Sequence, residues 1–441
     1  MREYIVELSK YFICILMVLY TLCCYLALPH AAKVRKSPVY VIQGLIMLAL
    51  QACCFADLVI ISNDIQYFLL FGFVEIFLLI IITLVPTIYE NCNRQLLNNM
   101  SMLLGIGLMM VSRLSYAKAI RQYVIVLISM ILCLLLPYLF TRIRFLKKLT
   151  WLYAAIGIGC LSAVLIIGNV VHGANITIDI AGVAFQPSEF VKILFLFFLA
   201  GALWEDSSFL RVAITAILAG IHVIILVLST DLGSALIFFI AYVLIVFMAT
   251  RNYLYLLAGA AGGSAAAVVA YKLFSHVRIR VLAWHDPWSY IDNQGYHITQ
   301  SLFAVGSGSW FGMGLLKGNP TVIPYVSADF IFSSICEELG VIFGICLILV
   351  CVNSFLVIML ISLKIFDKFY QMLVYGIGTM YIFQIFLTVG GGIKFIPLTG
   401  VTLPFISYGG SSVMSSMIMF FVIQGIFIRL QEEGAKRSGN G

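Results

Sequence analysis

Long apolar runs, each about 20 residues, recur along the chain, and short polar segments separate them. An α-helix of that length crosses the hydrocarbon core of a bilayer. The runs are continuous and do not alternate between apolar and polar residues, so they predict helices and not a β-barrel. We predict thirteen membrane-spanning helices, at residues 11–29, 39–62, 66–88, 97–113, 121–141, 149–169, 188–205, 211–229, 232–249, 253–274, 339–363, 371–391 and 411–429.

The composition supports this prediction. Hydrophobic residues make up 63% of the 441 positions and charged residues only 10%. A soluble core of this size could not hide so much apolar surface, so lipid is the expected solvent. Twelve spans remain an alternative to thirteen, because the window at 97–113 is short for a membrane helix.

The net charge of +7 comes from short basic clusters between apolar runs, such as 33–36, 142–148 and 436–437. Such clusters are typical of cytoplasmic loops that face anionic lipid, so we expect no nucleic-acid partner. If the N-terminus lies outside, four of the six inner loops are net basic, and 89–96 and 206–210 are the exceptions. The charge pattern therefore predicts an outer N-terminus and a cytoplasmic tail at 431–441.

The eleven cysteines lie mostly inside apolar runs, without a CxxC or Cys/His cluster, so we interpret them as packing residues and expect no metal ligands or disulfides among them. The first run follows Glu3 and Glu7, which favours a retained span over a cleaved signal peptide. The segment 275–332 is amphipathic and rich in Trp and Tyr. It is expected to form helices and turns on the outer bilayer surface.

Two polar clusters start predicted spans. In "FQPSEFVKI" (185–193), Glu189 and Lys192 are three residues apart and share a helix face. They either neutralise each other or face a cavity, since an intramembrane lysine is costly without a partner. In "STDLGSAL" (229–236), Asp231 is better explained as a helix N-cap than as a site residue.

Two further stretches are rich in glycine and serine. "GYHITQSLFAVGSGSWFGMGL" (295–315) allows close approach of backbone segments or of a phosphate. "LPFISYGGSS" (403–412) favours a turn followed by a capped helix, and a phosphate-binding turn is the functional alternative. Each of these signals is weak by itself.

The stretch "SADFIFSSICEELG" (327–340) places three carboxylates, Asp329, Glu337 and Glu338, before an apolar run. On one helix, Asp329 and Glu337 would lie about two turns apart and about 80° around the axis. A carboxylate buried near lipid has a raised pKa, which suits a general base near neutrality. The alternative is a pair of structural acids bonded to Lys192 or Arg280, and the residues alone do not decide.

Seven motifs in order make the chain similar to one family. These are "QPSEFVK", "DLGSA", "RIRVLAWHDPW", "GYHITQSLFAVGSG", "GMGL", "DFIFSSICEELG" and "LPFISYGGSS". They resemble the SEDS family of polytopic membrane proteins, typified by FtsW, RodA and SpoVE. The resemblance implies an all-α ten-helix core at 97–430 with an extracellular loop at 275–332. The segment 1–96 would then add three helices to that core.

The resemblance also implies an activity, which is polymerisation of lipid II into glycan strands at the outer face of the bacterial cytoplasmic membrane. Asp329 matches the family's catalytic aspartate, which deprotonates the acceptor sugar while undecaprenyl diphosphate leaves. Whether a divalent cation (Mg or Mn) binds there is left open, and no protein-held metal site is expected. A class B penicillin-binding protein and membrane lipids are the implied partners. The implied substrate-binding residues are Gln186, Glu189, Lys192, Arg280, Gln300, Ser301, Glu337, Lys394, Ser407, Tyr408 and Gly409.

Some positions depart from the family pattern. Ile176-Thr177 replace an Arg-Trp pair, Ser229-Thr230 precede Asp231 in place of Gln-Pro, and Tyr325 and Ser327 replace a Glu and a His. These departures leave a catalytically weak scaffold that recruits a crosslinking enzyme as one alternative. A lipid II flippase is another, although the inner halves of the spans carry few charges. The sequence does not indicate whether the protein serves division, elongation or sporulation.

Overall fold

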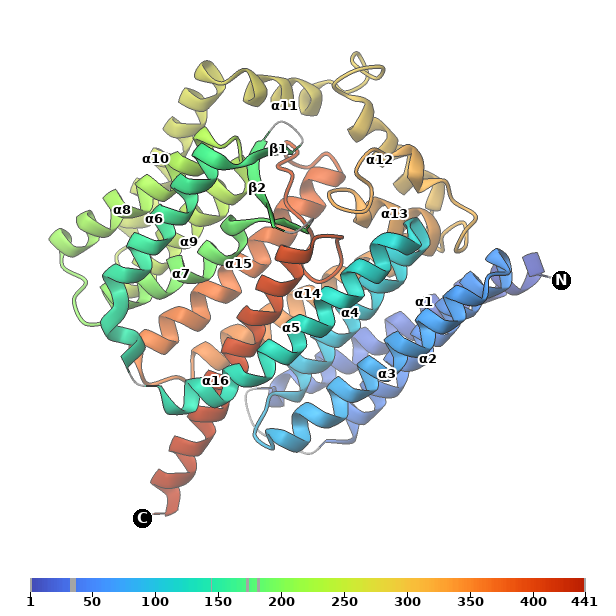
Figure 1. Cartoon of the computed structure of the whole chain (residues 1–441), viewed down its shortest axis with the longest axis horizontal. Coiled ribbons are helices and arrows are strands. Elements are labelled where there is room, and N and C mark those ends of the chain that lie inside the picture. The colour runs from blue at the N-terminus through green and yellow to red at the C-terminus, as the bar shows by residue number, and fades with distance from the viewer. Residues whose placement is uncertain (1, 32–36, 144, 172–173, 181–182, 440–441) are drawn as a thin grey trace.

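The computed structural model describes residues 2–31, 37–143, 145–171, 174–180 and 183–439. Its long helices form one bundle of tilted, roughly aligned rods (Figure 1). The first half of the bundle contains α1 (Arg2–Ala27), α2 (Pro38–Ser62), α3 (Ile65–Ile88), α4 (Arg94–Leu114), α5 (Tyr116–Arg142), α6 (Thr150–Ile167), α7 (Pro187–Leu203) and α8 (Phe209–Leu228). The second half contains α9 (Leu232–Thr250), α10 (Tyr253–Leu273), α11 (Ser275–His285), α12 (Tyr296–Gly308), α13 (Ile331–Leu339), α14 (Val341–Ser362), α15 (Lys368–Gly392) and α16 (Gly410–Gly439). Short 3-10 helices are η1 (Leu28–His30), η2 (Phe145–Leu149) and η3 (Pro320–Val322).

The prediction of a polytopic helical membrane protein is confirmed, because twelve helices of the described residues are long and apolar enough to cross a membrane. The one predicted window that is not among these twelve, 188–205, corresponds to α7, which has only 17 residues. A helix of that length rises about 25 Å, short of a full hydrocarbon core. Most of α7 is buried among the other helices, so protein rather than lipid surrounds it.

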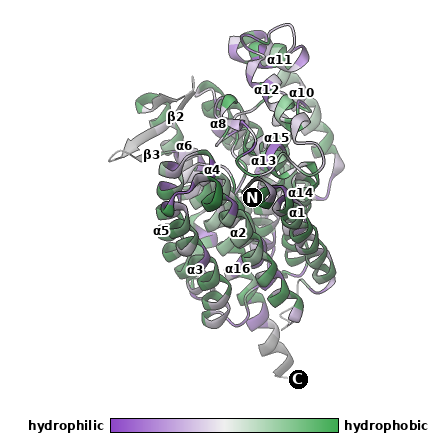
Figure 2. Ribbon diagram, turned by 90° about the vertical axis from the view of Figure 1, so that its right-hand side faces the viewer, coloured by the Kyte–Doolittle hydropathy of each residue, from purple (hydrophilic) through white to green (hydrophobic). Residues whose placement is uncertain are grey.

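A small antiparallel sheet lies between the predicted spans 149–169 and 188–205. Its strands are β1 (Asn169–Val171), β2 (Ala174–Ile180) and β3 (Val183–Phe185), in the order β1-β2-β3. Asn169 pairs with Thr177, and Ile178 pairs with Phe185. The polar and apolar residues of "ANITIDI" alternate, which is the signal of a strand. In Figure 2 the sheet extends from the side of the bundle.

Helix α4 is the centre of the bundle, and 18 of its residues are buried. Its polar residues give it a low hydropathy for a membrane span. They are tolerated because other helices, and not lipid, surround it. A buried amide network joins it to its neighbours. Gln95 Nε2 and Asn99 Nδ2 donate to Asn353 Oδ1 of α14 at 2.7 and 3.0 Å, and Asn99 Oδ1 accepts from Tyr20 of α1 at 3.2 Å.

The same network reaches the backbone of α1. Asn353 Nδ2 and Gln95 Nε2 donate to the carbonyl oxygen of Cys24 at 3.1 and 2.7 Å. Amides inside a membrane protein are stable when they satisfy each other, because no water competes for them. The N-terminal helices are therefore packed into the core and do not form a separate unit.

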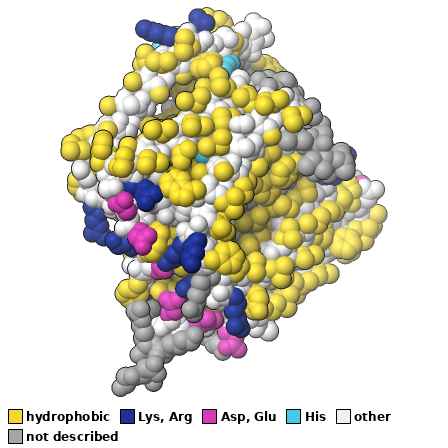
Figure 3. Space-filling model, turned by 60° about the vertical axis from the view of Figure 1, so that its left-hand side comes forward, with side chains coloured by type: hydrophobic (Ala, Val, Ile, Leu, Met, Phe, Trp, Pro, Cys, Tyr) yellow, Lys and Arg dark blue, Asp and Glu magenta, His cyan; other side chains and the backbone are white. Residues whose placement is uncertain are grey.

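The two ends of the bundle differ in character. Helices α11, α12 and α13 and the sheet lie at one end, which we call the loop end, and the C-terminus lies at the other (Figure 1). Hydrophobic residues fill the body of the bundle between them (Figure 2). On the face in Figure 3, an apolar surface separates basic residues at the loop end from mixed charges near the C-terminus. Helix α16 continues through the predicted tail to Gly439.

At Gly107, the backbone of α4 lies very close to the backbone of the loop before α16. A Cβ at Gly107 would lie 2.5 Å from the carbonyl oxygen of Phe405 and 2.7 Å from Cα of Ile406. Because backbone cannot rotate away, Gly107→Ala is expected to lower the free energy of unfolding by about 1–3 kcal/mol. Gly72→Ala on α3 is the control, since nothing lies within 4 Å of its Cβ. Thermal unfolding in detergent checks this, and equal melting temperatures for the two variants would contradict the packing.

Candidate active site

Asp329 lies at the loop end, in the turn between η3 and α13, two residues before α13 begins. Its backbone N–H donates to the carbonyl of Tyr325 at 3.2 Å. The loop before α16 supports this turn. Ser407 Oγ donates to the carbonyl of Ala328 at 2.5 Å, and the N–H of Tyr408 donates to the carbonyl of Ser327 at 2.7 Å. Two of the predicted site residues therefore hold the backbone on which Asp329 sits.

The carboxylate of Asp329 is half-buried, and the described residues form no ion pair with it. Burial raises the pKa of Asp329 to about 6, and the charge of Arg280 opposes that rise. Arg280 comes from α11, and its Nη1 donates to the carbonyl of Thr399 at 3.1 Å. The neighbouring Gly400 has φ +75°, and a Cβ there would lie 3.9 Å from Asp329 Oδ2. Asp329 is thus a carboxyl group that titrates near neutrality in a turn between two loops.

Arg280 is affected by two acids. Burial lowers the pKa of Arg280, and the negative charges of Asp329 and Asp231 raise it. Asp231 accepts from the N–H of Ser234 at 3.1 Å, which confirms the predicted N-cap of α9. Ser188 Oγ at the start of α7 donates to Asp231 Oδ2 at 3.4 Å. The charges of Arg280, Asp231 and Asp329 therefore form one electrostatic group.

Three helices begin close to this group. The N–H of Gln186, at the N-cap of α7, donates to Ser411 Oγ in the first turn of α16 at 3.0 Å. The Gln186 side chain donates to Ser188 Oγ at 3.2 Å, and Ser188 contacts Asp231 at the start of α9. The amino-terminal ends of α7, α9 and α16 therefore converge, and such ends favour negative charge.

Glu189 and Lys192 lie deeper and are almost fully buried. Lys192 Nζ lies 2.8 Å from Glu189 Oε2 and donates to Gln384 Oε1 at 3.0 Å. Ser415 Oγ donates to Glu189 Oε2 at 2.8 Å. Of the two interpretations of this pair, mutual neutralisation describes the geometry, and both charges are satisfied within the bundle.

The structure places Glu337 and Glu338 away from Asp329, at the other end of α13. The expectation that Asp329 and Glu337 share a helix is wrong, because α13 begins at Ile331. Glu337 Oε1 accepts from the N–H of Asn319 at 2.8 Å. Glu338 is bonded to Arg113 and not to Lys192 or Arg280, and the Arg113 Nη2–Glu338 Oε1 distance is 2.7 Å. Burial raises the pKa of Glu338, which the charge of Arg113 opposes.

Of the remaining predicted residues, Ser301, Lys394 and Gly409 make structural contacts. Ser301 Oγ bonds to the carbonyl of Gly392 at 2.7 Å and to Ser333 Oγ at 2.6 Å, which ties α12 to α15 and α13. Gln300 is half-buried beside it on α12. The carbonyl of Lys394 accepts from Trp284 Nε1 at 3.2 Å. The N–H of Gly409 donates to Gln122 Oε1 at 3.3 Å.

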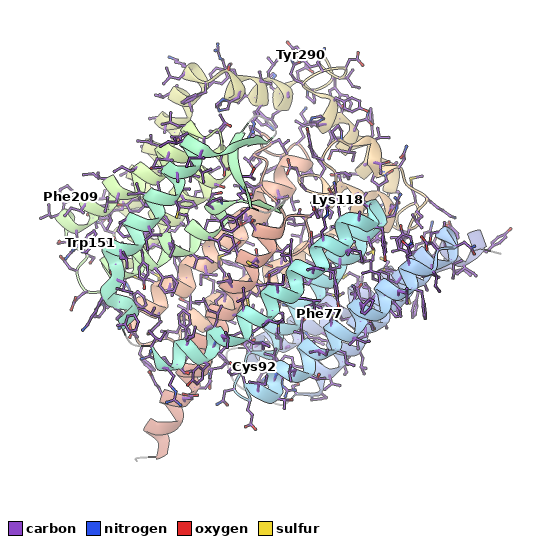
Figure 4. All side chains as sticks on the ribbon, viewed as in Figure 1. Phe77, Cys92, Lys118, Trp151, Phe209 and Tyr290 are labelled. Carbon is purple, nitrogen blue, oxygen red and sulfur yellow. The ribbon has the colours of Figure 1, made fainter. Side chains whose placement is uncertain are left out.

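Three residues of α4 and α5 also contact the predicted site residues and are not expected from the sequence motifs. Arg113 binds Glu338, and Gln122 Nε2 donates to the carbonyl of Ser407 at 3.2 Å. Lys118 Nζ donates to Ser327 Oγ at 3.0 Å and lies 5.3 Å from the centre of the Tyr408 ring. Figure 4 shows Lys118 at the loop end of α5. The spacing of Lys118 and Gln122, one turn apart at a helix start, was the available signal.

Whether a divalent cation binds at this site stays a prediction. Among the described residues, no group of three His, Cys, Asp or Glu side chains could hold a metal ion. The position of the missing Arg-Trp pair is only partly described. Thr177 in β2 is buried, with an unpartnered Oγ1, and the side chain of Ile176 lies outside the described residues.

Comparisons with known proteins agree with the fold. The peptidoglycan glycosyltransferase RodA of Mycobacterium bovis is 34% identical over 283 residues, which is 60% of this chain and 59% of that relative. The chain thus spans less than two thirds of the length of that relative. A probable peptidoglycan glycosyltransferase FtsW of Pseudoalteromonas translucida is 30% identical over 360 residues, which is 77% of this chain and 89% of that one.

Solved structures give the same fold. One chain of a structure described as coordinating polymerization and crosslinking in a peptidoglycan synthase complex superimposes with a TM-score of 0.65 at 24% identity, over 76% of this chain and 97% of that one. RodA of Thermus thermophilus gives a TM-score of 0.56 at 22% identity, over 76% and 96%. The model of the FtsW/RodA/SpoVE family, described as cell cycle protein, matches residues 93–432. The chain therefore belongs to the FtsW/RodA/SpoVE family, with α1 to α3 preceding the matched region.

Proposed function

We propose that this protein is a peptidoglycan glycosyltransferase that polymerises lipid II at the outer face of the bacterial cytoplasmic membrane. The observation that carries the proposal is Asp329, a half-buried acid at the loop end with a pKa of about 6 and no ion-pair partner among the described residues. A general base is most effective when its pKa lies near the working pH. The names of the relatives support the same reaction class.

In the proposed reaction, the Asp329 carboxylate takes the proton of the acceptor sugar hydroxyl. The hydroxyl oxygen then attacks the anomeric carbon of the donor and forms the new glycosidic bond. The bond from that carbon to the diphosphate breaks, and undecaprenyl diphosphate leaves with the electron pair. Arg280 and the converging starts of α7, α9 and α16 offer positive potential for the leaving diphosphate.

The charge pattern supports an outer position for the loop end. The end of α5 and η2, which carry Arg142, Lys147 and Lys148, lie at the opposite end of the bundle, where the C-terminus is also found (Figure 1). Positive charge of this kind marks the cytoplasmic side. Lipid II carried on the outer leaflet would then meet Asp329 directly. A class B penicillin-binding protein, which crosslinks the strands, is the proposed partner, and a solved relative is described as part of a complex for both reactions.

A flippase is the second candidate, and it requires a polar path through the bundle. Its most suitable polar groups are Lys192 and Glu189, which are buried and bonded to each other. Reconstituted vesicles with labelled lipid II separate the candidates. Glycan strands indicate the enzyme, movement of lipid II without strands indicates the flippase, and neither product indicates the scaffold.

Asp329→Asn removes the proposed base with little change in shape. Because general-base catalysis contributes about 10²- to 10⁴-fold, polymer formation should fall by that factor. Asp292→Asn is the matched control, since Asp292 is an exposed acid of the same outer segment. Strand length and yield from purified protein, with and without the penicillin-binding partner, measure the effect. Equal polymer from Asp329→Asn and its control would exclude Asp329 as the base.

The pH profile gives a second test. The base must be ionised, so the initial rate should rise as the pH increases through about 6, the pKa of Asp329. The charge of Arg280 lowers that pKa, so Arg280→Gln should move the midpoint to higher pH. The exposed Arg278 lies two residues away on α11, and Arg278→Gln should leave the midpoint in place. A midpoint that Arg280→Gln does not move would refute the electrostatic assignment.

A further inference from the structure

The segment between α12 and η3, residues 309–319, is bound to the end of α13, and we call it the strap. The N–H groups of Met313 and Gly314 donate to the carbonyls of Glu337 and Glu338 at 2.9 and 3.0 Å. In return, the N–H of Val341 donates to the carbonyl of Ser309 at 3.0 Å. Backbone approaches backbone so closely that a Cβ at Gly312 would lie 2.2 Å from the carbonyl oxygen of Glu338.

The strap also closes the base of the loop that carries Asp329. The N–H of Asn319, at the end of the strap, donates to Glu337 Oε1 at 2.8 Å. Arg113 also connects the strap to α13, because it pairs with Glu338 of α13 and donates to the carbonyl of Gly318 in the strap at 3.1 Å. A displacement of the strap therefore displaces both ends of the segment 320–336, which contains η3, the turn with Asp329 and most of α13.

The first helix of the chain contacts the strap from outside the core. Glu7 Oε2 lies 3.3 Å from Lys317 Nζ, and the rings of Tyr11 and Phe311 are 5.2 Å apart. Val6 packs against Gly314, where an added Cβ would lie 3.2 Å from Val6 Cγ1. Figure 1 shows the N-terminal end of α1 beside the loops that follow α12. Three successive points of the strap thus touch one turn and a half of α1.

Helix α1 is itself held in place at a second point. Its Tyr20 side chain and Cys24 carbonyl belong to the buried amide network with Gln95, Asn99 and Asn353. That network fixes the C-terminal half of α1 to α4 and α14. The first turns of α1 contact the strap. A helix anchored in this way resists movement of what it touches, because its packed contacts are close and rigid.

We propose that the N-terminal extension is a positioning element for the active site, in which α1 holds the strap and thereby the loop that presents Asp329. The inference rests on the proposed function. Glu7 and Tyr11 are its positioning residues and do not touch the substrate. Helices α1 to α3 precede the family match at 93–432, so this device uses residues outside the matched region.

The test uses the full-length protein in membranes and three variants, Glu7→Lys, Tyr11→Ala and the charge-swapped pair Glu7→Lys with Lys317→Glu. Leu8→Ala is the matched control, because Leu8 lies on the same turn and is 71% exposed. Glu7→Lys and Tyr11→Ala should each lower kcat about fivefold, or about 1 kcal/mol, with KM for lipid II and the melting temperature unchanged. The charge-swapped pair should recover most of the lost kcat, which loss of folding alone would not allow.

Hydrogen–deuterium exchange of residues 320–336 supplies a readout that does not depend on activity. Exchange in this segment should become faster in Glu7→Lys and Tyr11→Ala, and stay at the parental rate in Leu8→Ala and the charge-swapped pair. If the parent makes no polymer, the proposed function fails while exchange still tests the positioning. If both readouts of Glu7→Lys and Tyr11→Ala equal those of Leu8→Ala, or the swap recovers nothing, the positioning role is refuted.

Discussion

The buried ion pair between Arg113 and Glu338 is the constraint on which the loop end depends. The Glu338 side chain is fully buried, and Arg113 Nε donates to both of its oxygens, at 2.9 and 3.0 Å. Two charges removed from water are stable only when their geometry is good and their remaining hydrogen bonds are satisfied. Arg113 meets that condition by also binding the carbonyl of Gly318. The pair therefore fixes α4, α13 and the strap relative to each other before any substrate arrives.

The lipid solvent explains how much of the fold the sequence could predict. Apolar runs mark spans because lipid-facing helices must be apolar, and all thirteen predicted windows coincide with helices. The same rule misjudges helices that face protein. Helix α4 can carry Asn99 and Gln95 because Asn353 and the α1 backbone satisfy their hydrogen bonds. The hydropathy of α4 is therefore low for a helix inside a membrane protein. Helix α7 is similarly buried and is shorter than a span. Whether a helix such as α4 or α7 faces protein or lipid cannot be predicted from the sequence of that helix alone.

The site was predictable to the extent that its residues sit in local motifs. Asp231 is an N-cap and Pro187 begins α7, which are rules of a single helix end. The partners of Glu338 and Ser327 lie 225 and 209 residues away in the chain, so no local pattern announces Arg113 or Lys118. Spacing on one helix also misplaced Glu337, because the turn at Phe330 separates Asp329 from α13. Long-range pairing, and not residue type, decided which acid became structural.

Three buried or half-buried carboxylates, those of Glu189, Glu338 and Asp329, differ in the partners that surround them. Glu189 is neutralised by Lys192, and Glu338 is neutralised by Arg113, at 2.8 and 2.7 Å. An ion pair inside the protein offsets part of the cost of removing each charge from water and holds both side chains in one geometry. Asp329 forms no ion pair with the described residues, the charge of Arg280 lowers its pKa without a direct contact, and its pKa of about 6 leaves both protonation states accessible. Of these three acids, Asp329 is the one without an ion pair among the described residues, and the proposed role as a general base rests on that difference.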